Sequence, residues 1–323
     1  MKVFAIIQGA LGDGIMALWG LKAVADHTSC LLSLVCAPGL GALAMDLGLA
    51  QSAYSVQSPE MASLYGVDPS PWVKDQIQSH DVVLVFSFSK DLFQSVDALA
   101  TKAVQILPRP LAGETIHVLD HILGHLHKAG MVKYSCLKQH NALPNVFDLH
   151  SLHTRKPDSP VLIHPGSGSP RKNWSLNHFA DLYFALESKG IPGKFVLGPD
   201  DHALEIPLRE LLQDAVLKQP ESVLELKACL LDSRAYVGND SGATHLAAML
   251  GAPTVAIFGP SDPARWRPVG SRACVLQPSL TCDPCFETLS ENCENVLCLQ
   301  NTSPGAVLKA LEDLGVHLPI AVC

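Results

Sequence analysis

One stretch, residues 237–268, constrains the fold of this chain more than any other. It reads VGNDSGATHLAAMLGAPTVAIFGPSDPARWRP. Apolar residues over 235–237 predict a strand, and a helix rich in Ala and Leu is expected over 243–250, where Gly251 ends it. A second strand is predicted over 254–258. Strand, tight turn, helix and strand make a βαβ unit, so we expect a parallel sheet that binds ligands at the carboxyl ends of its strands.

The turn between the first strand and the helix predicts an anion site. Asp240 or Ser241 can cap the helix, and Gly242 lets a ligand approach the backbone. Free N–H groups and the helix dipole favour a phosphate there. Thr244 and His245 lie in the first turn, from which their side chains can reach the same ligand. The alternative is a capped helix whose glycines serve only tight packing.

A second phosphate-facing loop is expected between a strand over 161–164 and the helix that follows it. Ser167, Gly168 and Ser169 offer backbone N–H donors without bulk, and Lys172 adds a mobile cation that suits a diphosphate. An ordinary turn with a solvated lysine is the alternative interpretation.

The first residues of the chain predict another strand, loop and helix. A strand over 2–8 leads through Gly-Ala-Leu-Gly-Asp-Gly into a helix over 15–25. The loop lacks GxGxxG spacing, so it gives little support for a dinucleotide site. Asp13 is either a catalytic carboxylate or the cap of the helix, and Gly12 and Gly14 beside it are candidate substrate-binding positions.

These three segments together are similar to a known family. The pattern NDSGxxHLAAxLGxPxVAxFGPxDPxRWxP strongly resembles the donor-binding signature of glycosyltransferase family 9, the heptosyltransferases of lipopolysaccharide core assembly. The family's ALGD loop is matched at Asp13, which takes the place of its catalytic base. Its KxWP element is matched at Lys172 and Trp174, with Ser175 where proline is usual.

The resemblance implies the GT-B fold, an α/β architecture in which two Rossmann-like domains face each other across a cleft. The composition turns polar and proline-bearing over 141–160, which is typical of a linker. We therefore expect an N-terminal acceptor-binding domain over 1–155. A C-terminal nucleotide-sugar-binding domain is expected over 156–323, with a cysteine-rich loop at 282–298.

The cysteine-rich loop holds four of the ten cysteines of the chain, Cys282, Cys285, Cys293 and Cys298. In a cytosolic protein such clustering indicates metal more often than disulfides, and tetrahedral zinc accepts four thiolates. The spacing is not that of a zinc ribbon. Structural zinc and a loop of reduced thiols both remain open, and neither takes part in the chemistry.

Charge and hydropathy exclude several classes of function. A net charge of −8 argues against binding to nucleic acid, which needs a basic face. The longest uncharged apolar runs are as short as 82–86, so no membrane span is predicted. The N-terminus reaches Gly and Asp too early for a signal peptide. We expect a cytoplasmic protein with at most peripheral membrane contact, which the resemblance places at the inner face of the inner membrane.

The resemblance implies an inverting glycosyltransferase that moves heptose from ADP-heptose to a hydroxyl of a saccharide or glycolipid acceptor, such as lipopolysaccharide core. No Asp-x-Asp element occurs, so no metal or other cofactor is expected in catalysis. Lys172 and the helix start near Gly242 would neutralise the leaving diphosphate, and Asp13 would be the base.

The acceptor is less well defined than the donor. Residues 1–150 carry nine Lys and Arg against twelve Asp and Glu, a net charge of −3, and Gln8 replaces an arginine of the family. Both departures argue against a heavily anionic acceptor. Three alternatives stay open: a GT-B enzyme that uses a UDP- or GDP-sugar, a nucleotide-sugar-binding protein without turnover, and a metal-sensing protein built on the cysteines.

Overall fold

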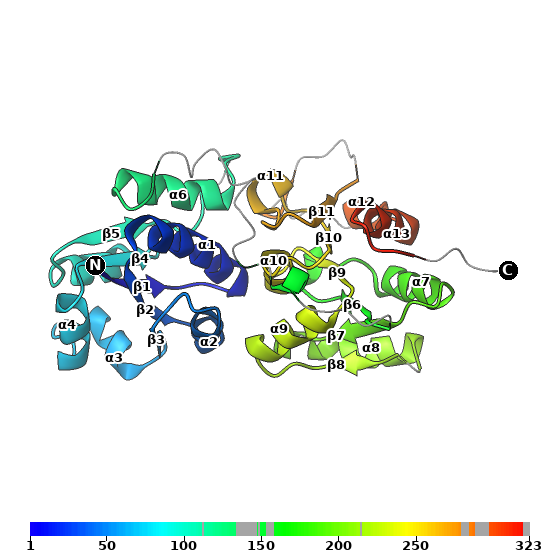
Figure 1. The fold of residues 1–323 in the computed structure, drawn as a ribbon, viewed down its shortest axis with the longest axis horizontal. Coiled ribbons are helices and arrows are strands. Elements are labelled where there is room, and N and C mark those ends of the chain that lie inside the picture. The colour runs from blue at the N-terminus through cyan, green and yellow to red at the C-terminus, as the bar shows by residue number, and fades with distance from the viewer. Residues whose placement is uncertain are drawn as a thin grey trace. The chain divides into compact units, whose positions relative to one another are not determined.

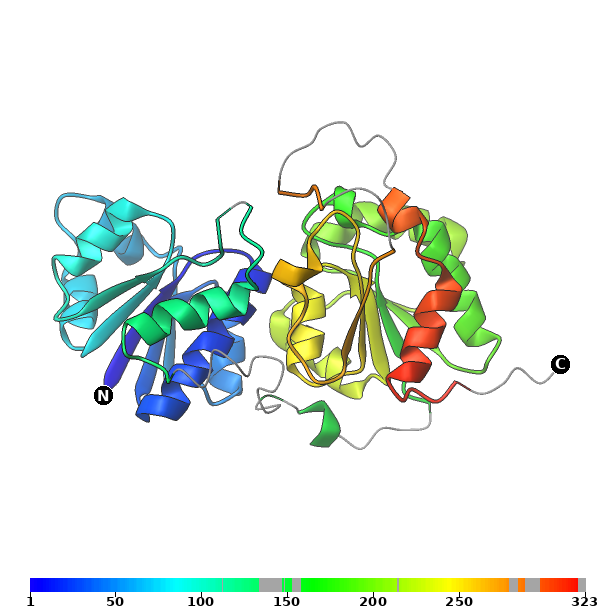
Figure 2. The same cartoon turned by 90° about the horizontal axis from the view of Figure 1, so that it is seen from above.

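The computed structural model describes residues 1–111, 113–133, 147, 149–152, 158–213, 215–278, 284–287 and 297–318. The chain divides into two compact units, Met1–Leu143 and Pro144–Cys323, each of them a parallel sheet with helices on both faces (Figures 1 and 2). The predicted boundary at residue 155 lies outside the described residues.

The sheet of the first unit has the strand order β3-β2-β1-β4-β5, and all its neighbouring strands are parallel. Its strands are β1 (Lys2–Ile7), β2 (Leu31–Cys36), β3 (Ser52–Ser55), β4 (Val82–Phe86) and β5 (Ala103–Ile106). Strand β1 is buried from Val3 to Ile7 because it lies at the centre, with Val3 opposite both Leu32 and Val82. The chain order reverses on either side of β1, as in Rossmann folds.

Helices of the first unit cover both faces of this sheet. They are α1 (Leu11–Thr28), α2 (Pro38–Asp46), α3 (Pro59–Ala62), the 3₁₀ turn η1 (Ser63–Tyr65), α4 (Pro71–Gln78), α5 (Lys90–Asp97) and α6 (Val118–Lys128). Helices α1 and α6 pack together where Gly20 leaves room for Ile122, since a Cβ at residue 20 would lie 2.7 Å from its side chain. On the other face, α3, α4 and α5 enclose a core that includes Ile6 and Met61.

The second unit has a six-stranded parallel sheet in the order β11-β10-β9-β6-β7-β8. Its strands are β6 (Val161–His164), β7 (Gly193–Val196), β8 (Leu217–Lys218), β9 (Ala235–Asn239), β10 (Thr254–Ile257) and β11 (Ala273–Leu276). Strand β9 lies between β6 and β10, so the residues that follow β9 and β6 meet at one edge of the sheet.

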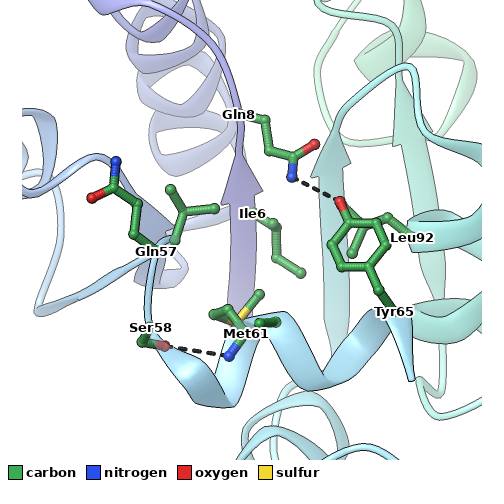
Figure 3. Close-up of a pocket in the computed structure, with 9 residues that line it drawn as sticks. Ile6, Gln8, Gln57, Ser58, Met61, Tyr65 and Leu92 are labelled. Carbon is green, nitrogen blue, oxygen red and sulfur yellow. Dashed lines mark hydrogen bonds between the residues drawn. The ribbon is translucent and has the colours of Figure 1, made fainter. Parts of the chain in front are cut away.

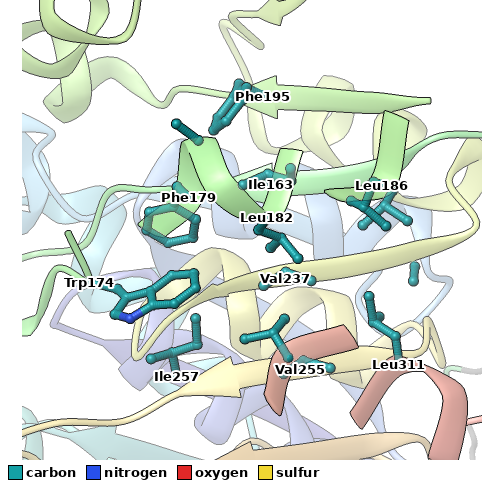
Figure 4. Packing of buried hydrophobic residues seen from close by; sticks show 14 of the residues in the cluster. Ile163, Trp174, Phe179, Leu182, Leu186, Phe195, Val237, Val255, Ile257 and Leu311 are labelled. Carbon is teal, nitrogen blue, oxygen red and sulfur yellow. The ribbon is translucent and has the colours of Figure 1, made fainter. Parts of the chain in front are cut away.

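The helices of the second unit are, in chain order, η4 (His150–Leu152), η5 (Pro170–Lys172), α7 (Leu176–Glu187), η6 (Pro199–Asp201), α8 (His202–Leu211), α9 (Val223–Asp232), α10 (Gly242–Met249), α11 (Pro263–Trp266), α12 (Leu297–Gln300) and α13 (Pro304–Asp313). Helices α7 and α13 contact each other over one face of the sheet. Figure 4 shows the core beneath them, in which Trp174 and Phe179 pack against Val237 and Ile257.

The structure confirms the α/β class and the βαβ unit predicted for residues 235–258. Two expectations on element bounds are corrected. Strand β9 continues to Asn239 because its pairing with β10 extends that far. Helix α1 begins at Leu11 rather than near Ile15, because the Asp13 side chain accepts a hydrogen bond from the Ala10 N–H and so completes the first turn. None of the described helices is long and apolar enough to cross a membrane.

Candidate functional site

The loop between β9 and α10 presents a helix start at the carboxyl edge of the second sheet. Ser241 is the N-cap residue, and its Oγ accepts a hydrogen bond of 3.3 Å from the Thr244 N–H. The hydroxyl of Thr244 donates to the Asn239 carbonyl, which fixes the turn. Ser241, rather than Asp240, therefore caps the helix, and the first N–H groups of α10 point out of the edge where an anion can bind.

Asp240 holds the cation that the second loop provides. The Lys172 ammonium lies 3.1 Å from Oδ2 of Asp240, and their side chains are only 14% and 9% exposed. Lys172 is thus a largely buried cation that is paired with Asp240, and not a solvated one. A diphosphate at this edge would meet Lys172 directly, with Asp240 as the competing anion.

His245 lies beside this pair, in the first turn of α10. Its side chain is buried, and Nε2 lies 4.0 Å from Oδ1 of Asp240. Burial lowers the pKa of His245 to about 4; the Asp240 carboxylate opposes this change and the Lys172 ammonium adds to it. His245 is therefore neutral at pH 7. Its Nδ1 has no hydrogen-bond partner within the described part of the chain, so it can serve a ligand.

Asn239 joins the two loops of the site. Its side chain is fully buried, its Nδ2 donates to the carbonyls of Pro165 (2.8 Å) and Gly166 (3.3 Å), and its Oδ1 accepts from the Trp174 N–H (2.9 Å). Asn239 belongs to the pattern of residues 237–268 but is not among the predicted site residues. The signal was available: β6 and β9 are both followed by polar loops, and a buried amide is suited to joining such loops.

A buried pair, His164 and Asp201, contacts Ser241 at the same edge of the second sheet. Nε2 of His164 is 2.9 Å from Oδ2 of Asp201, while Nδ1 of His164 is 3.5 Å from Oγ of Ser241. Burial disfavours the charged carboxyl of Asp201, but hydrogen bonds from His164 and the Gly198 N–H outweigh it and lower its pKa. Asp201 is therefore an anion that orients the His164 ring. Neither residue was singled out from the sequence.

The predicted donors of the second loop partly serve the loop itself. The Ser167 hydroxyl contacts the Ser169 carbonyl (2.7 Å) and Oδ1 of Asn173 (2.6 Å), and it accepts the Ser169 N–H (3.3 Å). Gly168 stands in open space, since a Cβ there would meet no atom within 4 Å. Gly166 is the restrictive glycine, because its Cβ would lie 1.8 Å from Oδ1 of Asp201.

The aromatic ring of Phe286, which was not predicted as part of the site, lies against the side chains of Arg171 and Lys172. The Phe286 ring centroid is 5.0 Å from the Lys172 ammonium and 5.7 Å from the Arg171 guanidinium. The backbone N–H groups of Cys285 and Phe286 both donate to the Pro260 carbonyl, which holds this short segment in place. Such contacts orient the cations without neutralising them.

Of the four clustered cysteines, Cys282 and Cys293 lie outside the described residues. The Arg171 guanidinium lies 3.8 Å from the Sγ of Cys285, and Cys298 is a buried residue of α12. Within the described ranges no three His, Cys, Asp or Glu side chains form a group that could hold a metal.

In the first unit, Asp13 lies in the first turn of α1, just after the loop that follows β1. Its Oδ2 accepts from the Ala10 N–H at 3.3 Å, and a Cβ at Gly9, whose φ is +133°, would lie 2.9 Å from the same oxygen. Asp13 thus helps to close the first turn of α1, in which Gly12 also lies. Gly14 is buried against Leu40, to which a Cβ would come within 2.5 Å, so packing alone requires this glycine.

A cavity of about 160 Å³ opens beside this loop, at the carboxyl ends of β1 and β3 (Figure 3). Its lining combines apolar side chains with amides and hydroxyls: Ile6, Gln8, Val56, Gln57, Ser58, Met61, Ala62, Tyr65 and Leu92. The Gln8 amide donates to the Tyr65 hydroxyl at 3.0 Å and accepts from the Ser87 hydroxyl at 2.7 Å.

Known proteins share both the sequence pattern and the fold. The family model described as glycosyltransferase family 9 (heptosyltransferase) matches residues 117–295. Lipopolysaccharide heptosyltransferase 2 of Escherichia coli K12 is 28% identical over 190 residues, which are 54% of this chain and 46% of that protein. The chain thus spans about half the length of this curated relative.

Solved structures extend the likeness to both units. The glycosyltransferase family 9 protein of Veillonella parvula superposes with a TM-score of 0.73 at 19% identity, over 97% of this chain and 96% of that one. The E. coli ADP-heptose lipopolysaccharide heptosyltransferase II gives 0.71 at 18% identity, over 97% and 98%. At such identities the likeness concerns the fold, and it confirms the predicted GT-B architecture of two Rossmann-like domains.

Proposed function

Because the chain belongs to glycosyltransferase family 9, we propose that it transfers a sugar from a nucleotide-sugar donor to a hydroxyl of a saccharide or glycolipid acceptor. The observation that carries this proposal is the largely buried ion pair of Lys172 and Asp240 beside the start of α10. A cation, free helix N–H groups and a buried carboxylate at one sheet edge suit a sugar diphosphate, whose phosphates need positive charge and whose sugar hydroxyls need an acceptor.

Among nucleotide sugars we propose ADP-heptose as the donor, because the family is one of heptosyltransferases and the E. coli relative is a heptosyltransferase. Its diphosphate would lie against Lys172 and the N–H groups that follow Ser241. Asp240, released from Lys172, would accept hydrogen bonds from sugar hydroxyls. In this proposal the enzyme is cytoplasmic. A glycolipid acceptor would bring the enzyme to the inner face of the inner membrane.

The reaction is a single inverting displacement. The acceptor oxygen forms a bond to the anomeric carbon while the bond from that carbon to the diphosphate oxygen breaks. Asp13 takes the proton of the attacking hydroxyl, and the nucleoside diphosphate leaves with the electron pair. Lys172 and the N-terminus of α10 stabilise the negative charge that develops on the leaving group, so the step needs no metal.

A structural zinc in the loop over 282–298 accompanies this proposal, away from the chemistry. Cys285, whose Sγ lies 3.8 Å from the Arg171 guanidinium, would be one of the zinc ligands, and zinc binds cysteine through sulfur. Metal analysis of the purified protein should find one zinc per chain, and Cys285→Ser should remove it without abolishing donor binding. If the purified protein is stable and contains no zinc, the four cysteines are reduced thiols and the zinc proposal is wrong.

Calorimetric titration with ADP-heptose and with UDP-, GDP- and CMP-sugars tests the donor site. Lys172→Ala should weaken ADP-heptose binding by about 10- to 100-fold, the range expected for hydrogen bonds to charged groups. The matched control is Lys218→Ala, on the exposed edge strand β8, which should leave binding unchanged. Asp13→Asn should retain donor binding and lose transfer.

Each other outcome has a definite meaning. Binding confined to UDP- or GDP-sugars would replace heptose and keep the transferase. Donor binding without transfer to any saccharide acceptor would identify a nucleotide-sugar-binding protein. If no nucleotide sugar bound, the donor site would be refuted.

A further inference from the structure

The cavity beside β1 lies at the point where the first sheet changes direction. Gln8 directly follows β1 and Ser87 directly follows β4, and the order of the chain reverses between these two strands. Ligands of open α/β sheets bind at this switch point, outside the carboxyl ends of the strands. Gln8, which lines the cavity, thus lies at this switch point, and its position favours a ligand site in the first unit.

The polar part of the lining consists of amides and hydroxyls. In Figure 3 Gln8 and Tyr65 meet above the cavity, and Ile6, Met61 and Leu92 surround it below. The contacts to Ser87 and Tyr65 engage one N–H and one lone pair of the Gln8 amide. The second N–H and the second lone pair remain for a ligand. None of the nine lining residues carries a charge.

Size and chemistry together select the ligand class. A cavity of about 150 Å³ holds benzene, which has six heavy atoms, so the 160 Å³ here take one face of a single pyranose, whose remaining hydroxyls lie outside the cavity. An uncharged pyranose offers a C–H face to Met61 and Leu92 and hydroxyls to Gln8 and Tyr65. A phosphate or carboxylate here would lose water without gaining a cation, which is unfavourable.

The candidate base is close along the chain. Asp13 is five residues after Gln8, and its carboxylate folds back over Gly9 to the Ala10 N–H. One loop thus connects the polar side of the cavity to Asp13. A sugar held by Gln8 would place its outward hydroxyls toward the loop that carries the base.

We propose that this cavity is an acceptor subsite that takes one uncharged sugar residue, and that Gln8 selects it against phosphorylated sugars. This inference rests on the proposed transferase function and defines its acceptor class. Gln8 is a specificity-determining residue in this view, and Tyr65 orients its amide.

Methyl-labelled methionine provides a direct reporter, since Met61 lines the cavity and is one of six methionines. Its ¹³C-methyl NMR signal is assigned with Met61→Leu. The probes are the methyl glycosides of glucose, galactose and mannose and their 6-phosphates, titrated without donor. The Met61 signal should shift with at least one neutral glycoside at millimolar concentration, and about tenfold less affinity is expected for its 6-phosphate.

Gln8→Arg should reverse this preference by about tenfold in favour of the 6-phosphate, since an arginine pairs with phosphate. Gln51→Arg makes the same change at the exposed amino end of β3, on the opposite edge of the sheet, and should change nothing. Tyr65→Phe, which keeps the ring, should weaken the neutral glycoside without unfolding the unit.

Tighter binding of the 6-phosphates to the wild type, a Met61 shift with ADP alone, or no shift with any glycoside would overturn the proposal. Titration of ADP-heptose on the same samples separates this failure from that of the proposed function. If ADP-heptose binds through Lys172 while the Met61 signal shifts with none of the glycosides, the subsite is wrong and the transferase stands.

Discussion

Replacing Asn239 by alanine tests whether the two phosphate-facing loops are held by one buried amide. The side chain is fully buried and makes three hydrogen bonds, to the carbonyls of Pro165 and Gly166 and from the N–H of Trp174. Truncation leaves one buried N–H and two carbonyls without these partners and opens a small void.

The magnitude follows from these contacts. An unsatisfied, fully buried N–H costs about 2–3 kcal/mol, and the loss of the hydrogen bond to Pro165 adds about 1 kcal/mol, so we expect a loss of roughly 3–4 kcal/mol. For a unit of this size each kcal/mol lowers the melting temperature by about 2–4 °C, which gives a drop of roughly 6–16 °C.

Differential scanning calorimetry measures this drop for the transition of the second unit, with that of the first unit as an internal reference. Asn177→Ala is the matched control because Asn177 is exposed on α7, and it should change stability by no more than about 0.5 kcal/mol. ADP-heptose affinity should fall as well, since Lys172 follows the displaced loop. A loss below about 1 kcal/mol would refute the reasoning.

Two further predictions concern the same edge of the second sheet. Gly166→Ala should destabilise the second unit by about 1–3 kcal/mol or more, because the new Cβ would lie 1.8 Å from Oδ1 of Asp201, whereas Gly168→Ala meets no atom within 4 Å and should leave the melting temperature unchanged. Folded His245 takes up a proton only near pH 4, whereas its ordinary pKa is 6.5. The unfolded state therefore binds more protons between these values, and the second unit should lose up to about 3 kcal/mol as the pH falls through this window. His245→Gln should flatten that part of a denaturant-midpoint profile, and an unchanged slope would contradict a buried neutral imidazole.

The sequence predicted the elements of the donor site because their signals are local. The Gly-Asn-Asp-Ser-Gly turn sits between an apolar strand and an Ala/Leu helix, and each signal covers only a few residues. Residue type and spacing predicted a cap at Asp240 or Ser241 and a cation at Lys172, and the structure places the cap at Ser241. These positions are the ones at which local propensity and the global fold agree.

The contacts between distant segments could not be predicted in this way. Asn239 meets Gly166 across 73 residues, and Phe286 meets Lys172 from a segment more than a hundred residues away. Neither side chain has a partner at helical or strand spacing, so periodicity carries no trace of the contact. No strand order was predicted from the sequence, and only the pairing of β6 with β9 in the structure shows that Asn239 lies beside the loop after β6.

Gln8 shows how the structure changes the meaning of a departure from the family. From sequence alone the missing arginine argues only against an anionic acceptor. The structure adds that Gln8 is fixed on both sides, by Ser87 and by Tyr65, above a cavity without charged lining. These contacts hold the amide in place, and with the uncharged lining they are the observations on which the proposed neutral acceptor rests.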